Sequence, residues 1–155
     1  MNSSRRESAA ELKARALRLL ARREHSRDEL AGKLSPHAES KETLESVLDF
    51  LVAKKLLSSE RFAEVRARSL ARKYGAAKIR QDLKAKGLGD ELVARVSTDG
   101  ELERARGILQ RKYRGQATTR EERARRARFL QGRGFSYDAI RGALGLSSST
   151  NFFEE

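Results

Sequence analysis

The chain has 155 residues, a length that suits one domain or a short array of small repeats and excludes a large multidomain enzyme. Its 34 lysines and arginines exceed its 22 acidic residues, and the resulting net charge of +12 predicts attraction to a polyanion, either nucleic acid or an acidic protein surface. Cysteine is absent, which excludes disulfides and thiolate zinc sites and is typical of a protein in a reducing cytosol.

Helix is the regular structure that the sequence supports along its length. Pro36 is the single proline, and no alternation of apolar and polar residues between turn signals predicts a strand. Helices of about two to four turns are marginal alone in water, so packing between them must supply the stability. In chain order, we expect helices over residues 9–24, 27–35, 41–55, 60–74, 76–86, 90–97, 101–113, 120–132 and 136–144.

Local signals indicate the helix starts and the buried faces. In a capping box, a hydroxyl accepts a hydrogen bond from the amide three residues on, and the carboxylate there reaches back. Four pairs have this spacing: Ser8 and Glu11, Ser26 and Glu29, Thr98 and Glu101, Thr119 and Glu122. Apolar side chains at helical spacing predict the core faces, as in Leu44, Val47, Leu48 and Leu51 of one helix and Phe62, Val65, Leu70 and Tyr74 of the next.

Similar segments recur along the chain. Residues 70–75 resemble residues 109–115, with the two tyrosines 39 positions apart. Residues 83–88 resemble residues 130–135 at an offset of 47, and a fainter copy opens the chain. Chance similarity among helices rich in lysine, arginine and leucine is the alternative explanation.

The recurrence predicts an all-α protein, an elongated, curved array of three tandem three-helix repeats. Their expected bounds are residues 9–57, 58–98 and 99–145. A disordered N-terminal segment (residues 1–8) would precede them. A polar C-terminal tail (residues 146–155) would follow, and it contains Phe152 and Phe153.

Motifs for catalysis and cofactor binding are absent from the sequence. No phosphate-binding loop, dinucleotide fingerprint or His-Glu-x-x-His helix occurs, and neither His25 nor His37 has the partners that complete a metal site. The carboxylates on residues 42–49 flank no nucleophile, so a solvated helix face explains them. The longest apolar run, residues 50–53, is far below the about 20 residues that a membrane span needs. We expect a soluble, cytoplasmic protein that is not an enzyme and binds no cofactor, metal or membrane.

Positive charge is concentrated in the second half of the chain. Residues 104–141 hold twelve basic and three acidic side chains, and a second basic group lies over residues 66–86. Arginine dominates, and its planar fork suits bidentate contact with phosphate or carboxylate. The helix at residues 120–132 carries arginines around most of its circumference, which is typical of a helix that faces solvent or a polyanion. The candidate contact residues are Arg72, Lys73, Lys78, Arg80, Lys84, Lys86, Arg111, Lys112, Arg114, Arg123, Arg125, Arg126, Arg128 and Arg133.

Four short segments carry a family resemblance through their order and spacing. They are residues 26–30 with Leu34, residues 61–64, residues 75–83 with residues 86–88, and residues 129–135 with Ile140. Over residues 10–144 the chain thereby resembles the RecX family, bacterial regulators of the RecA recombinase. It departs from the family pattern at residues 58–60, where Ser-Ser-Glu replaces an expected acidic pair, although a serine still suits a helix start there.

The resemblance implies a regulator that binds the RecA filament on DNA, along its helical groove, and inhibits ATP hydrolysis, filament extension and strand exchange. Such a monomeric protein would modulate recombination, DNA repair and the SOS response, with RecA as its partner and single- or double-stranded DNA as a second contact. The alternative is a basic helical protein that binds DNA or RNA independently of RecA. A solvated basic surface without a dedicated ligand, or a purely structural helical adaptor, also fits the composition.

Overall fold

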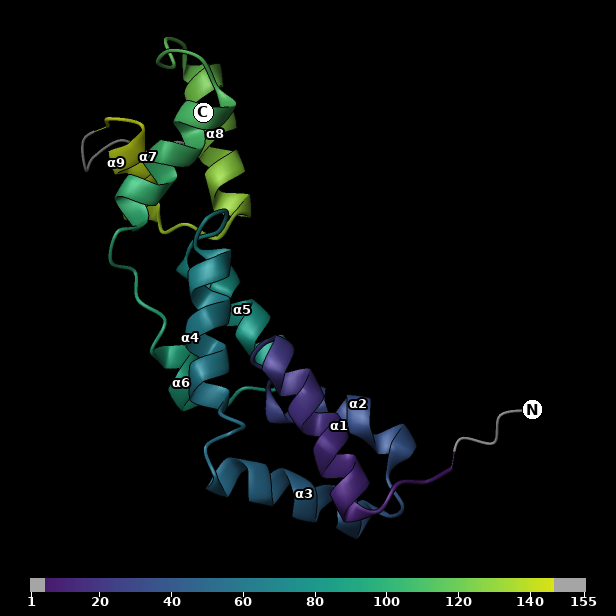
Figure 1. Ribbon diagram of the computed structural model, residues 1–155. Coiled ribbons are helices and arrows are strands. Elements are labelled where there is room, and N and C mark those ends of the chain that lie inside the picture. The colour runs from purple at the N-terminus through teal and green to yellow at the C-terminus, as the bar shows by residue number, and fades with distance from the viewer. Residues whose placement is uncertain (1–4, 147–155) are drawn as a thin grey trace. The chain divides into compact units, whose positions relative to one another are not determined.

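A computed structural model describes residues 5–146, and its regular structure is helical (Figure 1). The predicted all-α class is therefore confirmed, and the described residues contain no strand beyond one isolated bridge between Glu7 and Ala38. None of the helices in this range is both long and apolar enough to cross a lipid bilayer. The elements are α1 (Ala9–Arg22), α2 (Arg27–Leu34), the 3-10 turn η1 (Ser35–His37), α3 (Lys41–Ala53), α4 (Ser59–Leu70), α5 (Ala76–Ala85), α6 (Asp90–Ala94), α7 (Glu101–Lys112), α8 (Arg120–Gly132) and α9 (Tyr137–Ala143).

Side-chain caps explain most of the helix starts. The hydroxyls of Ser8, Ser26 and Thr119 accept hydrogen bonds from the amides three residues on, at 3.4, 3.1 and 3.1 Å, so three of the four predicted caps are confirmed. Ser58 accepts from the Arg61 amide at 3.1 Å, which preserves a cap where the sequence departs from the family pattern. Ser40 and Ser136 cap α3 and α9 in the same way.

The predicted cap at Thr98 and Glu101 is wrong. The N-cap of α7 is Gly100, which has a φ of 76° and makes no side-chain cap bond. Glu101 instead turns inward and is only 3% exposed. Its Oε1 accepts from the Ala76 amide at 2.8 Å and its Oε2 from the Ser136 amide at 3.3 Å, so one carboxylate serves the starts of α5 and α9.

Contacts divide the chain into two compact units. The first contains residues up to Arg66 together with Ala85–Gly89, and the second contains Ala67–Lys84 together with the residues from Asp90 onward. In the first unit α1, α2 and α3 pack on one another. Their shared core is aliphatic and consists of Leu12, Ala16, Leu30, Leu34, Ala38, Leu44, Val47, Leu48, Leu51 and Leu57.

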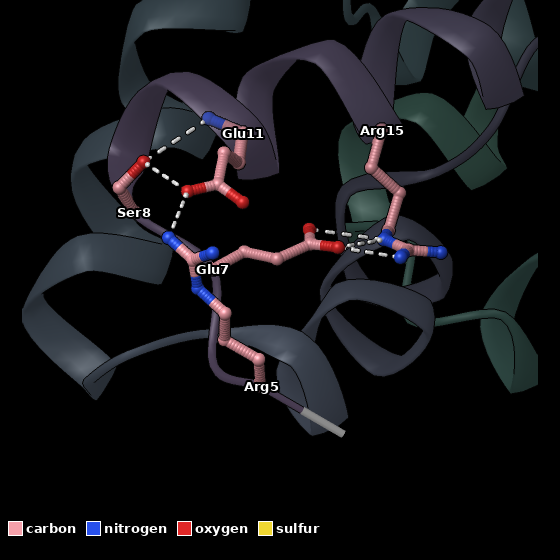
Figure 2. Close-up of polar contacts among 5 residues, drawn as sticks. All are labelled: Arg5, Glu7, Ser8, Glu11 and Arg15. Carbon is pink, nitrogen blue, oxygen red and sulfur yellow. Dashed lines mark hydrogen bonds and ion pairs between the residues drawn. The ribbon is translucent and has the colours of Figure 1, made fainter. Parts of the chain in front are cut away.

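The segment before α1 differs from our expectation of disorder over residues 1–8. Figure 2 shows Glu7 directed toward Arg15 and Arg5 toward Glu11. The Glu7 carboxylate accepts from Arg15 Nε at 3.0 Å, and the Glu7 amide donates to the His37 carbonyl at 2.7 Å. Residues 5–8 are polar but have specific partners, whereas residues 1–4 and the tail with Phe152 and Phe153 lie outside the described residues.

The second unit has its own core beneath α7, α8 and α9. This core is formed by Ala105, Ile108, Leu109, Ala127, Leu130, Phe135 and Ile140. The loop before α5 and the loop after α8 are joined by a backbone hydrogen bond, in which the Gly75 amide donates to the Arg133 carbonyl at 2.8 Å. A β-carbon at Gly75 would lie 2.5 Å from the Gly134 carbonyl oxygen, so no larger residue fits without moving the backbone.

Most predicted core positions are buried, with one clear exception in α4. Val65 is 49% exposed, although the apolar spacing predicted that it would pack with Phe62. The buried face of α4 centres on Phe62 and Ala63, and at 3.6 residues per turn Val65 falls beyond its edge.

Candidate polyanion-binding surface

The fourteen predicted basic residues all have solvent access. Nine are exposed: Arg72, Lys73, Lys78, Lys84, Arg111, Lys112, Arg114, Arg125 and Arg128. Five are half-buried: Arg80, Lys86, Arg123, Arg126 and Arg133. Lys86 belongs to the first unit and the other thirteen belong to the second, so most of the predicted surface lies on a single compact body.

Aromatic rings, not carboxylates, hold several of these cations. Tyr113 and Phe129 meet edge to face, with centroids 6.2 Å apart. Lys112 Nζ lies 4.0 Å from the Phe129 centroid, and the Arg126 guanidinium lies 4.6 Å from the Tyr113 centroid. Arg133 lies 5.1 Å from the Phe129 centroid. A ring orients a cation without neutralising its charge, so this cluster stays positive.

Backbone carbonyls also accept hydrogen bonds from some of these arginines. Arg80 Nη2 donates to the Val96 carbonyl at 2.7 Å, and Arg126 Nη1 donates to the Gly115 carbonyl at 3.0 Å. A carbonyl carries only a partial charge, so these arginines are positioned while keeping most of their positive field. The result is an ordered cationic surface.

One open concavity of about 580 Å³ in the second unit is lined by Arg68, Ala71, Arg72, Lys73, Arg104 and Arg111. We call it the arginine concavity. Five of its six lining side chains are cationic, and none of these five is paired with a carboxylate in the part of the chain that the structure describes. It joins the end of α4 and the following turn to α7.

The sequence prediction included part of this site and missed part of it. Arg72, Lys73 and Arg111 were predicted, and they meet at the concavity, whereas Arg68 and Arg104 were left out of the candidate set. Arg68 lies one helical turn before Arg72, a spacing that places both on one face and could have identified it. Arg125 and Arg128, which were predicted, do not line the concavity.

A second concavity, of about 730 Å³, lies at the end of α7 and beside α9. Its lining is mixed and includes Arg106, Arg114 and Arg126 together with Tyr113 and neutral residues. Basic residues of the predicted set therefore contribute to two separate hollows of the second unit, and only the arginine concavity is nearly all cationic.

Groups suited to hold a metal ion are not found among residues 5–146. His25 has structural partners: its ring Nδ1 lies 3.0 Å from the Arg23 carbonyl, and Lys33 Nζ lies 3.0 Å from its Nε2. Burial lowers the pKa of His25 below its ordinary value, which favours the neutral ring.

Comparison with known proteins identifies three matching domain families in succession. Residues 13–51 match the first three-helix domain of RecX, residues 60–96 match the second, and residues 99–144 match the third. These matches group the helices in threes, with α1 to α3 in the first domain, α4 to α6 in the second and α7 to α9 in the third, in agreement with three three-helix repeats.

Curated relatives extend the similarity over most of the chain. A regulatory protein RecX of Herbaspirillum seropedicae is 44% identical over 135 residues, which cover 85% of this chain and 88% of that protein. One from Leptothrix cholodnii is 45% identical and covers 88% of each chain. One from Chromobacterium violaceum is 36% identical and covers 93% of this chain and 95% of that protein.

Solved structures show the same fold at lower identity. The crystal structure of RecX from Lactobacillus salivarius superposes with a TM-score of 0.77 at 19% identity, over 88% of this chain and 94% of that one. A second crystal structure of a regulatory protein RecX gives a TM-score of 0.70 at 22% identity, over 88% of this chain and 73% of that one.

Proposed function

This chain belongs to the RecX family of regulatory proteins, and from that premise we propose that it binds the RecA filament on DNA, in the filament's helical groove. Bound there, it inhibits ATP hydrolysis, filament extension and strand exchange, and so modulates recombination, DNA repair and the SOS response. It acts in the cytoplasm as a monomer. The role is regulatory, not catalytic, and needs no cofactor.

The observation that carries this proposal is the unneutralised positive charge of the second unit. Arginines that rest on rings and carbonyls are ordered before the partner arrives, so little side-chain entropy is lost on binding. A nucleoprotein filament offers both acidic side chains and phosphates, and electrostatic steering raises the rate of encounter with such a surface. We assign the contact to the fourteen predicted basic residues together with Arg68 and Arg104.

The decisive experiment measures ATP turnover by RecA on single-stranded DNA while this protein is added. We expect turnover to fall at substoichiometric ratios, because one bound copy that contacts several RecA protomers obstructs all of them. Unchanged turnover at equimolar protein and modest salt would rule the mechanism out. Heat-denatured protein at the same concentration controls for nonspecific charge.

The second candidate is a nucleic-acid-binding protein that acts without RecA, and the arginine concavity is the observation that favours it. This function predicts tight binding to bare DNA or RNA, with a salt slope of about −0.7 per neutralised phosphate on single strands. Binding that requires RecA would argue against it. Turnover and bare-DNA measurements on one preparation therefore separate the two functions.

A further inference from the structure

We propose that the arginine concavity binds consecutive phosphates of one nucleic-acid strand and reads no base. This inference rests on the second candidate function and deepens it, because it names the chemical group that the arginine concavity binds. It rests on the lining residues, their charges and their positions in the repeats.

The first argument is charge density. Arg68, Arg72 and Arg111, with two further cations, surround one opening and find no carboxylate among the described residues. A single protein carboxylate neutralises one of these charges, whereas a nucleic-acid strand carries one negative charge per nucleotide at close, regular spacing. Guanidinium forks also match phosphate oxygens bidentately. A phosphodiester chain therefore satisfies this opening better than isolated acidic side chains.

The second argument is that part of the lining is held in place. Arg104 Nη1 donates to the Asp99 carbonyl at 3.1 Å and its Nη2 donates to the Tyr74 carbonyl at 3.3 Å. Its Nε is buried without an acceptor in the part of the chain that the structure describes. Arg104 is therefore a fixed positive charge at the concavity that loses little freedom when an anion binds.

The third argument comes from the repeats. Arg72 and Arg111 occupy equivalent positions, each two residues before the tyrosine that defines the 39-residue offset. Both line the same concavity, so the middle and last repeats each contribute the same cation to one site. Two matched cations on neighbouring repeats suit a ligand that itself repeats, as phosphates along a strand do.

The absence of base readout follows from the same lining. Its sixth residue is Ala71, and no asparagine, glutamine or aromatic side chain belongs to it. Amide side chains are the usual readers of adenine, and aromatic side chains are the usual platforms for stacked bases. Arginine can read guanine, but we assign the guanidinium forks of this lining to phosphate oxygens. We therefore expect binding that is insensitive to sequence.

The test compares two double variants of the full-length protein that lose the same charge. Arg72→Gln with Arg111→Gln alters the concavity, and Arg18→Gln with Arg22→Gln alters two exposed arginines of α1 that lie outside the proposed binding residues. Affinity for a fluorescent single-stranded 20-mer is measured by anisotropy over a range of salt. The concavity variant should bind about 25-fold more weakly at 0.1 M salt, with a slope shallower by about 1.4, which are the effects of two lost phosphate contacts. The α1 variant should change much less.

Three further outcomes decide the inference. Oligo-dT and a mixed sequence of the same length should bind equally, and a strong preference between them would overturn the absence of base readout. Poly-glutamate of equal charge should compete poorly, and equal competition would reassign the site to an acidic protein surface. Equal losses in both double variants would mean diffuse charge and no site. Circular dichroism of each variant confirms folding, and Arg72→Lys with Arg111→Lys, which keeps the charge, should recover part of the affinity.

Discussion

The first and third repeats bury similar aliphatic cores but treat their arginines differently. Residues 9–57 hold ten basic and eight acidic side chains, and residues 99–145 hold twelve basic and six acidic ones. In the first repeat Arg27 bridges Glu45 and Asp49, at 2.8 and 2.7 Å. In the third, Arg126 contacts a ring and a carbonyl. The charge that a region can offer a ligand therefore depends on what its arginines already contact, more than on how many there are.

Ion pairs in the first unit also connect distant segments. Glu24 pairs with Arg61 at 2.9 Å and Arg23 pairs with Glu29 at 2.8 Å, so arginine there stabilises tertiary structure. In the second unit, by contrast, Arg106 and Glu103 form an ion pair between neighbours on one helix, α7. Such exposed local pairs are worth only a few tenths of a kcal/mol. The arginines that line the arginine concavity thus remain available for a partner.

The largest expected effect tests whether the two repeats really share one kind of core. Leu48→Ala in the first repeat and Leu130→Ala in the third should each lower the free energy of unfolding by about 2–5 kcal/mol, because both side chains are fully buried. Urea denaturation measures the loss. Leu83→Ala in α5 should lower the free energy of unfolding by a similar amount, because Leu83 is also fully buried. A Leu130→Ala variant of unchanged stability would mean that the third repeat is held together by something other than its apolar core.

A smaller effect is expected at Glu101, the acidic residue that the third repeat does bury. Glu101→Ala leaves the Ala76 and Ser136 amides without their acceptor and should cost about 2–3 kcal/mol. Glu101→Gln keeps one acceptor oxygen and should cost less. Thermal melting of both variants separates the two contributions. Equal stability of Glu101→Ala and the parent would show that water replaces the carboxylate.

Charge reversal on α8 should separate binding from folding. Replacing Arg125, Arg126 and Arg128 by Glu removes the contacts of Arg126 with the Tyr113 ring and the Gly115 carbonyl and should cost about 1 kcal/mol, while binding to RecA filaments weakens in co-sedimentation. Far-ultraviolet circular dichroism should remain helical. The matched control reverses Arg15, Arg23 and Arg27 of the first repeat, which breaks ion pairs and should lower the melting temperature more. Unfolding of the α8 variant would place its arginines in the packing.

Acid should weaken the first unit modestly, through two groups whose pKa values are lowered by folding. Burial lowers the pKa of His25, so its stabilising effect is complete above the ordinary value of about 6.5 and is lost as pH falls through the folded value. The Arg23 guanidinium lowers the pKa of Glu29 to about 2, so that contribution begins to fall below pH 4.5. Melting curves from pH 8 to pH 2 measure both. His25→Gln should flatten the decline below pH 6.5, and an unchanged decline would exclude His25 as its source.

Helix positions were predictable because their signals are local. The caps at Ser26 and Thr119 and the apolar spacing of α3 depend on residues within a few positions, and the structure confirms them. The cap at Thr98 failed because the partners of Glu101 lie 25 and 35 positions away. No pattern of neighbouring residues reveals such a competition for one carboxylate.

The grouping of the basic residues was only partly predictable for a related reason. Sequence composition located the basic half of the chain, and the repeat offset marked Arg72 and Arg111 as equivalent. The four-residue spacing from Arg72 marks Arg68, but that Arg104 joins them depends on where α7 lies relative to residues 68–73, which no local signal encodes. The order of residues 5–8 likewise depends on contacts with Arg15 and the His37 carbonyl. The polar composition of this segment does not indicate these contacts.

The backbone hydrogen bonds between the loops at Gly75 and Gly134 have a consequence for unfolding. In most repeat proteins neighbouring repeats contact each other through side chains, and a terminal repeat can unfold separately from the rest. Here the Gly75 and Ala77 amides of the middle repeat donate hydrogen bonds to the carbonyls of residues 133 and 134 in the last repeat. Both repeats should therefore melt in one cooperative step, and those two amide protons should exchange with deuterium only when the last repeat opens.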